Sequence, residues 1–332
     1  MQATDEPPDL ALRSAIDGLL EGASMAELER ASARLSAAYR QARPGVRPIV
    51  SRADRLAYVA ARLPSTFEAS RAVLAELRRR APTLRAESLL ELGAGPAPGL
   101  WAARPAFPEL ARATHVEIDR GMAELGRRLL AAGAAGAGVR RTWREHDVGR
   151  AREAGAHDLV LLAYVLGEMP AAAGDRAIDA AWDVTAGALV VIEPGTPAGA
   201  ARALRVRERL IGRGARVAAP CPHGGACPLA ADDWCHFGVR VSRSRLQRHL
   251  KEGRLAYEDE KYAYVALTRG EPAPCTGRVL RRPSAGPRRR RLRLCTVAGV
   301  REELVTRREG ARYRAARKIR WGEGWAPAAS KS

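Results

Sequence analysis

Residues 88–99, with the sequence SLLELGAGPAPG, decide the fold of this 332-residue chain. A short, mainly apolar run breaks there into glycines and prolines, as a buried parallel strand does when it enters a loop above a sheet. Strand-like and helix-like segments then alternate through THVEID, RGMAELGRRLLAA, RTWREHDV, HDLVLLAYVL, residues 171–186 and GALVVIEPG. This alternation predicts an α/β fold with a doubly wound, Rossmann-like sheet over residues 85–215.

Helical patterns precede the predicted sheet. Apolar residues recur at helical spacing over residues 9–43, where Pro44 ends the pattern, and again over residues 51–80, which Pro64 divides. We therefore expect an N-terminal helical region at residues 1–84.

The chain changes character again after residue 215. Residues 216–325 contain clustered cysteines, a helical stretch, two strand-like segments (YAYVALTRG and RRLRLCTVAGV) and a basic closing helix. Arginine and leucine alternate in the second segment, which predicts a strand with one buried and one positive face. We expect a C-terminal β/α domain over 216–325 and an unstructured tail at 326–332.

The loop after the first strand has the composition of a nucleoside-binding turn. Glu91, Gly93, Gly95 and Gly99 stand between a strand and a helix, where glycine lets the backbone approach a ligand closely. A dinucleotide fingerprint needs G-x-G-x-x-G, but here the third glycine comes one position late. The E-x-G-x-G form is instead typical of S-adenosylmethionine sites, so we predict that this cofactor binds here.

Downstream carboxylates are candidate partners of the cofactor. Glu117 ends the next strand, where a carboxylate can accept hydrogen bonds from both ribose hydroxyls. Asp119 competes for that role, although its position also suits the N-cap of the following helix. Asp147 follows the third strand, placed to meet the adenine amino group or to be a surface-loop carboxylate.

The sequence identifies no catalytic base. The fourth strand is followed by AYVLGEM, which lacks the Asn/Asp-Pro-Pro-aromatic tetrapeptide of amino-group methylation, and there is no Pro-Cys nucleophile. Tyr164 and Glu168 face the right region, but we interpret them as structural or helix-capping residues. The pattern leaves open whether the chain is an enzyme.

Charge points to a polyanionic partner. The chain has 56 Lys and Arg against 37 Asp and Glu, a net charge of +19, and a pI near 10.8. Nucleic acid is the first candidate, and a GC-rich coding sequence is the alternative source of so much arginine. No apolar run is long enough to cross a bilayer, and MQATDEPPDL lacks the layout of a secretory signal, so we expect a cytoplasmic protein.

Three cysteines cluster within fifteen residues: Cys221, Cys227 and Cys235. Structural disulfides are rare inside cells, and thiolates select zinc or iron–sulfur clusters. His223 or His236 would complete a zinc site, and free thiols are the alternative without a metal. Cys295 lies farther on, in the Arg/Leu segment, and we interpret Cys275, in a Pro-rich linker, as a bystander.

The chain resembles the methyltransferase-like assembly factors of the mitochondrial small ribosomal subunit, a family with bacterial members. The resemblance begins near residue 50 and rests on ARLPSTFEASRAVL, ELGAGPAPGLWAA, CPHGGACPL with WCHF, LCTVAG and YRAARKIRWGEGW. It implies a Rossmann-like S-adenosylmethionine-dependent methyltransferase fold with a cofactor loop at Gly93, Gly95 and Gly99, where the family commonly has a further glycine in place of Ala97.

The same resemblance implies a [4Fe–4S] cluster and association with small-subunit ribosomal RNA. Carried over by motif, the four cluster ligands are Cys221, Cys227, Cys235 and Cys295. Arginine pairs with phosphates and stacks on bases, so we expect the Arg-rich stretch 278–320 to contact RNA. Trp321 and Trp325 are expected either to stack on a base or to anchor the terminal helix.

The leading hypothesis is an S-adenosylmethionine-binding, iron–sulfur protein that acts on small-subunit ribosomal RNA or in subunit assembly and translation. Two further hypotheses are considered. The first is a non-catalytic RNA-binding assembly module that uses the methyltransferase fold. The second is a zinc-containing methyltransferase of small molecules.

Overall fold

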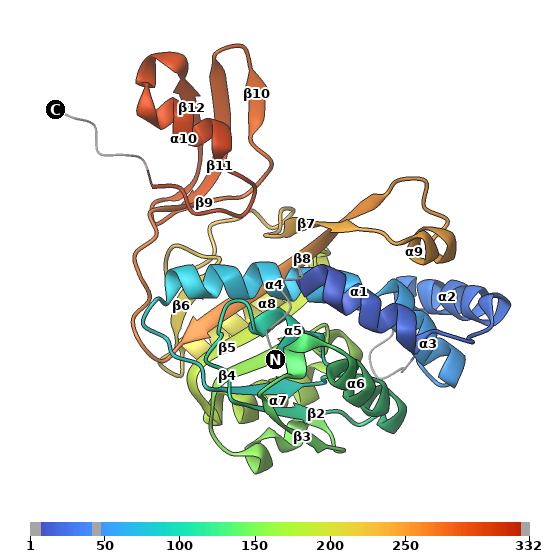
Figure 1. Cartoon of the computed structure of the whole chain (residues 1–332). Helices are drawn as coiled ribbons and strands as arrows, with labels where there is room; N and C mark the ends of the chain where they lie inside the picture. The colour runs from blue at the N-terminus through green and yellow to red at the C-terminus, as the bar shows by residue number, and fades with distance from the viewer. Residues whose placement is uncertain (1–7, 42–47, 327–332) are drawn as a thin grey trace.

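The apolar runs of the sequence form one central sheet in the computed structural model, which describes residues 8–41 and 48–326 (Figure 1). Its strands are β1 (Ser88–Leu92), β2 (Arg112–Val116), β3 (Arg140–Arg144), β4 (His157–Ala163), β5 (Thr185–Pro194), β6 (Arg216–Ala219), β7 (Phe237–Ser242) and β8 (Tyr257–Thr268). Their order is β3-β2-β1-β4-β5-β8-β6, and β7 pairs with β8. Strands β1 to β5 are parallel, whereas β8 is antiparallel to β5, β6 and β7. The predicted α/β, Rossmann-like sheet is confirmed.

The sheet extends beyond residue 215, where we expected the Rossmann-like domain to end. Strand β8 inserts between β5 and β6, so its second half is buried on both sides. Its first half reaches past the sheet and pairs with β7 through a register that runs from Phe237 opposite Tyr262 to Ser242 opposite Tyr257. The segment that contains YAYVALTRG therefore belongs to the central sheet, and not to the C-terminal domain where we expected it.

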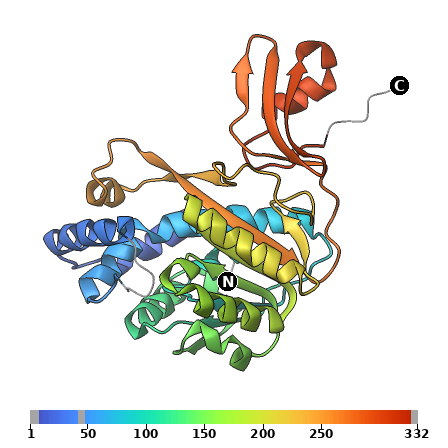
Figure 2. The same ribbon diagram turned by 180° about the vertical axis from the view of Figure 1, so that it is seen from behind.

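Alternating side chains of the central strands build a separate core on each face. Leu89 and Leu161 pack against α4 (Leu63–Arg80), α5 (Pro98–Ala103) and α6 (Arg120–Ala132). Leu90 and Leu162 point the other way and pack against α7 (Ala171–Asp183) and α8 (Pro197–Ile211), as alternation along a strand requires. Figure 2 shows α8 lying across the sheet on that second face.

The helical lead-in packs on one side of the sheet. It consists of α1 (Pro8–Leu19), α2 (Met25–Arg40), α3 (Arg52–Ala61) and α4, with the break before α4 near Pro64 that the sequence predicted. The single pattern over residues 9–43 forms two helices, because a turn at Leu20–Ala23 with Gly22 at φ 74° separates them. A short helix, α9 (Arg245–Leu250), packs against α2 and α3.

The C-terminal residues form a small domain of their own above the main sheet (Figure 1). It contains β9 (Gly277–Val279), β10 (Ser284–Gly286), β11 (Arg289–Thr296), β12 (Gly299–Thr306) and α10 (Ala311–Lys318). In β11, Leu292 and Leu294 are buried while Arg291 is exposed, which confirms the predicted division into an apolar and a positive face. Residues 327–332 of the predicted tail lie outside the described residues.

The remaining helical elements are single 3₁₀ turns: η1 (Ala134–Gly136), η2 (Val148–Ala154), η3 (Leu166–Glu168) and η4 (Arg307–Glu309). Among the helices in the described part of the chain, none combines the length and the apolar character needed to cross a membrane.

Candidate functional site

The loop after β1 turns back sharply above the sheet. Gly93 and Gly95 have φ angles of 67° and 52°, in the left-handed region that favours glycine. The amide nitrogens of Gly93 and Ala94 both donate to the carbonyl oxygen of Val116, which holds the loop against the end of β2. A Cβ atom on Gly93 would approach Val165 Cγ2 to 2.6 Å, so position 93 requires glycine for space as well as for conformation.

Ala97 shares the conformation of the two glycines. It has a φ of 59° and precedes the first residue of α5. A residue with a Cβ atom carries a steric cost there, and glycine does not. The left-handed backbone conformation therefore explains why the family that this chain resembles commonly has glycine at position 97.

Glu91 and Gly99 lie behind the loop, and neither lines the adjacent cavity. The Glu91 carboxylate accepts a hydrogen bond from the Gly99 amide nitrogen at 2.7 Å, and its other oxygen lies 3.1 Å from Nδ1 of His115. Both side chains are buried, and the His115 ring stacks on Trp143. In this arrangement Glu91 positions the start of α5 and leaves ligand contact to other residues.

The cavity opens where the parallel strands end, and the structure brings four of the predicted residues together there: Gly93, Gly95, Glu117 and Asp147. Residues of the helical lead-in cover it: Tyr39, Pro48, Ile49 and Tyr58. No motif marks these covering residues in the sequence. The cavity volume is about 160 Å³, below the roughly 300–1,000 Å³ usual for ligand cavities.

Glu117 forms the floor of the cavity beside the glycine loop. Its carboxylate accepts hydrogen bonds from the Gly95 amide at 2.7 Å and the Asp119 amide at 2.8 Å. Burial raises the pKa of Glu117, because desolvation disfavours the charged form more than these two hydrogen bonds stabilise it. A half-buried carboxylate with lone pairs left over is suited to accept hydrogen bonds from ribose hydroxyls.

Asp119 serves chiefly as a helix cap. It is the N-cap of α6 and accepts a hydrogen bond from the Met122 amide at 2.9 Å, as its position predicted. Arg55 of α3 also binds it, with Nε 2.8 Å from Oδ1. Asp147 is exposed at the rim of the cavity, where it accepts a hydrogen bond from the Gly149 amide at 2.8 Å.

Tyr164 and Glu168 both line the cavity. Tyr164 has a φ of 62°, and its hydroxyl donates to Oε1 of Glu260 at 3.1 Å. Burial raises the pKa of Tyr164 well above its ordinary value, and the nearby Glu260 carboxylate adds to this effect. With its hydroxyl engaged and its ionisation opposed, Tyr164 is placed as a structural residue of the cavity wall.

The clustered cysteines lie at a second cavity, of about 610 Å³, between α8 and the segment that joins β6 to β7. Cys221, Cys227 and Cys235 line it. Cys295 comes from β11 of the C-terminal domain, and its Sγ lies 3.7 Å from Nε2 of His223. Cys275 lies apart from this group, half-buried, with its Sγ donating to the carbonyl oxygen of Gly277.

The four thiols are close enough to oppose one another's ionisation. Burial, followed by the neighbouring Cys221 and Cys227, raises the pKa of Cys295 to about 12. Burial likewise raises the pKa of Cys235, and the other three cysteines contribute next. Thiols from the β6–β7 segment and from β11 thus share one electrostatic environment across 60 or more residues of sequence.

Two buried guanidinium groups face the cysteines. Nε of Arg207 and Nη2 of Arg278 are buried without a hydrogen-bond partner among the described residues, and both arginine charges lower the pKa of Cys221 against the larger effect of burial. Each arginine thus keeps one N–H group without a partner among the described residues, close to Cys221 and Cys295. Within residues 8–41 and 48–326, no three His, Cys, Asp or Glu side chains are grouped so as to hold a metal ion.

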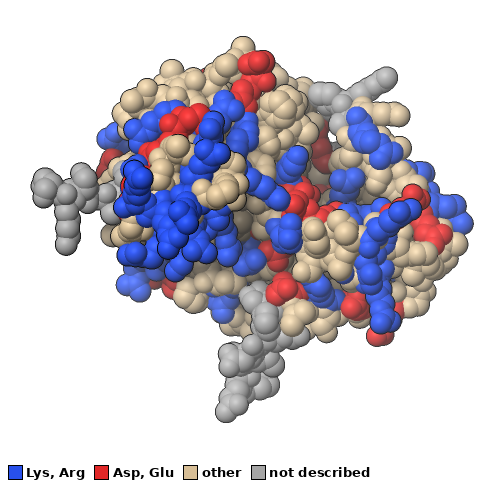
Figure 3. Space-filling view, turned by 90° about the horizontal axis from the view of Figure 1, so that it is seen from above, with Lys and Arg blue, Asp and Glu red and all other residues tan. Residues whose placement is uncertain are grey.

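The positive charge of the Arg-rich stretch divides into paired and unpaired side chains. Arg281 and Arg293 bind Asp233, Arg282 binds Asp259, and Arg301 and Arg312 bind Glu303. Nine other side chains are exposed and form no ion pair with a described carboxylate: Arg288, Arg289, Arg291, Arg307, Arg308, Arg314, Arg317, Lys318 and Arg320. We call these nine residues the basic face, and Figure 3, which looks down on the C-terminal domain, shows Lys and Arg gathered densely there.

Two residues within or beside the predicted RNA-contacting stretch are not available to RNA. Arg278 is fully buried and binds Glu76 and two carbonyl oxygens. Trp325 is buried in the core of the C-terminal domain and donates from Nε1 to Glu303 at 2.7 Å, so it anchors the end of the chain. Trp321 is half-buried and packs edge to face on His236.

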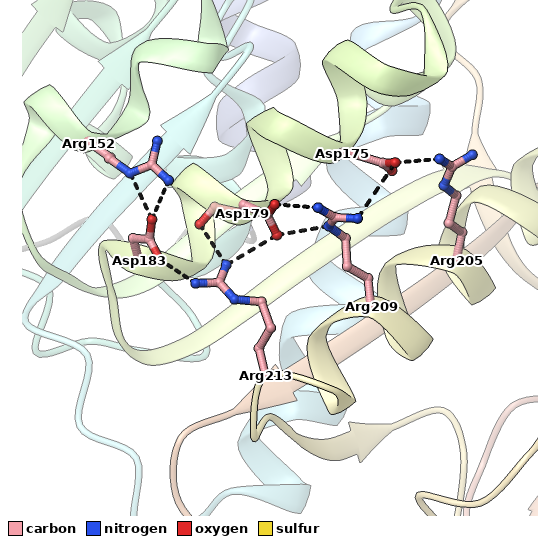
Figure 4. A network of polar contacts seen from close by, with 7 residues as sticks. All are labelled: Arg152, Asp175, Asp179, Asp183, Arg205, Arg209 and Arg213. Carbon is pink, nitrogen blue, oxygen red and sulfur yellow. Dashed lines mark hydrogen bonds and ion pairs between the residues drawn. The ribbon is translucent and has the colours of Figure 1, made fainter.

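The exposed arginines Arg205 and Arg209 of α8, and Arg213 just after it, are paired with carboxylates of α7. Figure 4 shows the alternating carboxylates and guanidinium groups of this network, which also includes Arg152 of η2: Arg152, Asp175, Asp179, Asp183, Arg205, Arg209 and Arg213. In this surface network, each carboxylate offsets the charge of a neighbouring guanidinium group. The basic face of the C-terminal domain has no such compensation.

Comparisons with known proteins agree with the sequence motifs. The human "Ribosome assembly protein METTL17, mitochondrial" is 28% identical over 303 residues, which cover 81% of this chain and 61% of that protein. This chain thus matches about three fifths of the length of that relative.

Solved structures with similar chains include two methyltransferases. Magnesium protoporphyrin IX methyltransferase from Synechocystis PCC 6803 is 12% identical, with 81% of this chain and 100% of that chain covered and a TM-score of 0.42. The N-methyltransferase NodS from Bradyrhizobium japonicum WM9 is 17% identical, with 61% and 87% covered and a TM-score of 0.39.

A protein-family model matches most of the chain. It is described as "Mitochondrial small ribosomal subunit Rsm22" and matches residues 52–326, which include the glycine loop, the cysteines and the basic face. The resemblance seen in the sequence is confirmed, and the chain belongs to the mitochondrial small ribosomal subunit Rsm22 family.

Proposed function

We propose that this chain binds S-adenosylmethionine and a [4Fe–4S] cluster and acts on small-subunit ribosomal RNA, in assembly of the small ribosomal subunit. The observation that carries the proposal is the basic face, nine exposed cations without carboxylate partners on a domain that also supplies Cys295. Family membership and the printed name of the human relative, a ribosome assembly protein, support the same direction.

The cofactor part of the proposal rests on the cavity at the ends of the parallel strands. Gly93 and Gly95 line this cavity, and the Glu117 carboxylate beside them would accept hydrogen bonds from the ribose hydroxyls. Asp147 at the rim would accept a hydrogen bond from the adenine amino group. When bound, S-adenosylmethionine supplies an activated methyl group.

The cluster part of the proposal rests on the four thiols and the two arginines beside them. Cys221, Cys227, Cys235 and Cys295 would hold the cluster, and their coordination would join the segment after β6 to the C-terminal domain. Metal binding and folding are coupled when ligands are distant in sequence, so this junction would fix the basic face relative to the cofactor cavity.

A non-catalytic role is the second candidate, and one observation favours it. The Tyr164 hydroxyl at the cavity is already bound to Glu260. The sequence after β4 lacks the Asn/Asp-Pro-Pro-aromatic tetrapeptide of amino-group methylation. In this version of the function the chain holds a ribosomal intermediate through its basic face and uses the methyltransferase fold for binding. The third candidate, a zinc-containing methyltransferase of small molecules, needs zinc in the protein and no RNA.

Crosslinking of the protein to RNA in cells, followed by sequencing of the attached fragments, tests the proposal. We expect small-subunit ribosomal RNA to be enriched, and enrichment to fall when Arg289, Arg291 and Arg308 are replaced by Gln. Fragments drawn evenly from all cellular RNA would contradict it.

Two measurements on the purified protein separate the candidates. Titration calorimetry with S-adenosylmethionine should show binding by the wild type and none by Gly93→Arg, whose side chain cannot fit against Val165; no binding by the wild type removes the cofactor part. Iron, sulfide and zinc are determined on protein purified without oxygen, and zinc without iron would favour the third candidate.

A further inference from the structure

Arg207 of α8 is buried beside the segment that carries the cysteines. Its Nη2 donates to the carbonyl oxygens of His223 at 2.9 Å and Gly225 at 2.6 Å, so it holds the turn between Cys221 and Cys227. The side chain is only 3% exposed, and its Nε has no partner among the described residues. A buried N–H group without a partner costs free energy, so a hydrogen-bond acceptor next to Nε would stabilise this side chain.

Arg278 of β9 reaches the same place from the C-terminal domain. Its Nε donates to the carbonyl oxygen of Pro220, which directly precedes Cys221, at 2.7 Å. Its Nη1 binds Glu76 and Gly322, whereas its Nη2 is buried and unpartnered among the described residues. Like Arg207, it is a permanently charged group within the electrostatic reach of Cys221 and Cys295.

We propose that Arg207 and Arg278 are positioning residues of the cluster, whose unpartnered N–H groups donate to cysteine or cluster sulfur and whose charges offset those of the thiolates. This inference rests on the cluster of the proposed function. One arginine comes from each of the two domains that share the cysteines, so each domain brings a cation as well as a ligand. Hydrogen bonds to sulfur and nearby positive charge stabilise the reduced, more negative state of such clusters.

Replacement of Arg207 by Gln in the full-length protein, purified without oxygen, tests the inference. We expect iron to be lost to a chelator about tenfold faster than from the wild type, as is usual when a partner of a metal ligand is removed. The reduction potential of the cluster should become more negative, because a positive charge has been withdrawn. Arg207→Lys keeps the positive charge but not the planar, forked guanidinium group. It should therefore restore the reduction potential but only part of the resistance to iron loss.

Arg205→Gln is the matched control, since Arg205 lies on the same helix, is exposed and binds Asp175. It should leave iron release and potential unchanged. Far-ultraviolet circular dichroism shows whether each variant is folded. If Arg207→Gln is folded but contains no iron while Arg207→Lys retains it, the inference is supported in its stronger form.

The inference is overturned if Arg207→Gln and the wild type release iron at the same rate and have the same potential, or if Arg205→Gln changes both as much as Arg207→Gln does. A misfolded Arg207→Gln leaves the decision to Arg207→Lys, in which an unchanged rate of iron release would count against it. A wild-type protein without iron and sulfide has a different meaning, because that result removes the cluster from the proposed function itself.

Discussion

Arg278 on β9 donates a hydrogen bond from Nη1 to Oε1 of Glu76 on α4, over 2.5 Å and across 202 residues of sequence. The Arg278 side chain is fully buried, and that of Glu76 nearly so. Helix α4 packs on the central sheet, whereas β9 belongs to the C-terminal domain, so this pair is a buried electrostatic link between the two. It is one of the contacts, with the ion pairs of Asp233 to Arg281 and Arg293, that hold the basic face relative to the cofactor cavity.

Replacement of Glu76 by Gln should destabilise the protein strongly. It would leave the Arg278 charge buried without a countercharge, which costs about 3 kcal/mol or more of the free energy of unfolding. The midpoint of urea denaturation, followed by tryptophan fluorescence, measures the loss.

Arg79 provides the control for this prediction. It binds the other oxygen of Glu76, but its side chain is 62% exposed, so Arg79→Gln should cost no more than about 1 kcal/mol. Equal losses in the two variants would show that the buried link adds nothing beyond a surface ion pair.

The sequence predicted the parts of the fold that local patterns control. Short apolar runs became β1, β4 and β5, and the Arg/Leu alternation became β11 with its two faces, because the spacing of apolar residues determines which side of a strand is buried. The glycine loop was also predictable, since its positive φ angles require glycine at Gly93 and Gly95.

Long-range pairing was not predictable in the same way. Nothing local shows that β8 inserts between β5 and β6, or that its first half continues outward to pair with β7, so the expected boundary at residue 215 fell inside the sheet. The prediction that Arg278 contacts RNA was wrong for a related reason. Among the fifteen arginines of residues 278–320, its side chain alone is fully buried, and only the fold brings Glu76 to it. Tyr39 and Tyr58, which cover the cavity, come from helices without a motif.

Removal of charge from the basic face should weaken RNA binding and its dependence on salt. We consider the triple variant Arg289→Gln, Arg291→Gln, Arg308→Gln. If each of the three side chains contacts one phosphate of single-stranded RNA, the slope of log affinity against log salt should fall by about 2. Fluorescence anisotropy with a labelled fragment of small-subunit ribosomal RNA measures affinity and slope together.

The ion-pair network on α8 supplies a variant with the same change in net charge. Arg205→Gln, Arg209→Gln, Arg213→Gln removes three cations that are already bound by Asp175, Asp179 and Asp183 (Figure 4). Its salt slope should match that of the wild type. If both triple variants reduce the slope equally, RNA responds to total charge and the basic face has no special role.

The affinity for S-adenosylmethionine should fall as the pH is lowered. The fall should begin at a higher pH than it would with a glutamate of ordinary pKa. Burial raises the pKa of Glu117, and the ribose hydroxyls need the ionised carboxylate as an acceptor. Protons therefore compete with the ligand, and the affinity falls as pH descends through the raised pKa. Calorimetry from pH 8 to pH 5 measures this dependence.

Glu117→Gln separates this effect from that of other groups at the cavity, such as His146 and Asp147. The amide does not titrate, so the variant should bind more weakly, with the acidic decline removed. A decline of the same size in the variant would assign the pH dependence to another group.

Removal of iron should loosen the C-terminal domain and leave the central sheet intact. Cys295 lies on β11, whereas the other three proposed ligands follow β6, so loss of the cluster removes the junction between the two parts. Hydrogen exchange should then become faster in β9, β11 and β12 but not in β1 and β4. Cys295→Ala should reproduce the effect of chelation, and Cys275→Ala should not, because Cys275 is not a proposed ligand and its Sγ donates to the Gly277 carbonyl oxygen. Unchanged exchange in β11 after complete loss of iron would mean that ion pairs, such as those of Asp233 with Arg281 and Arg293, are sufficient to hold the domain in place.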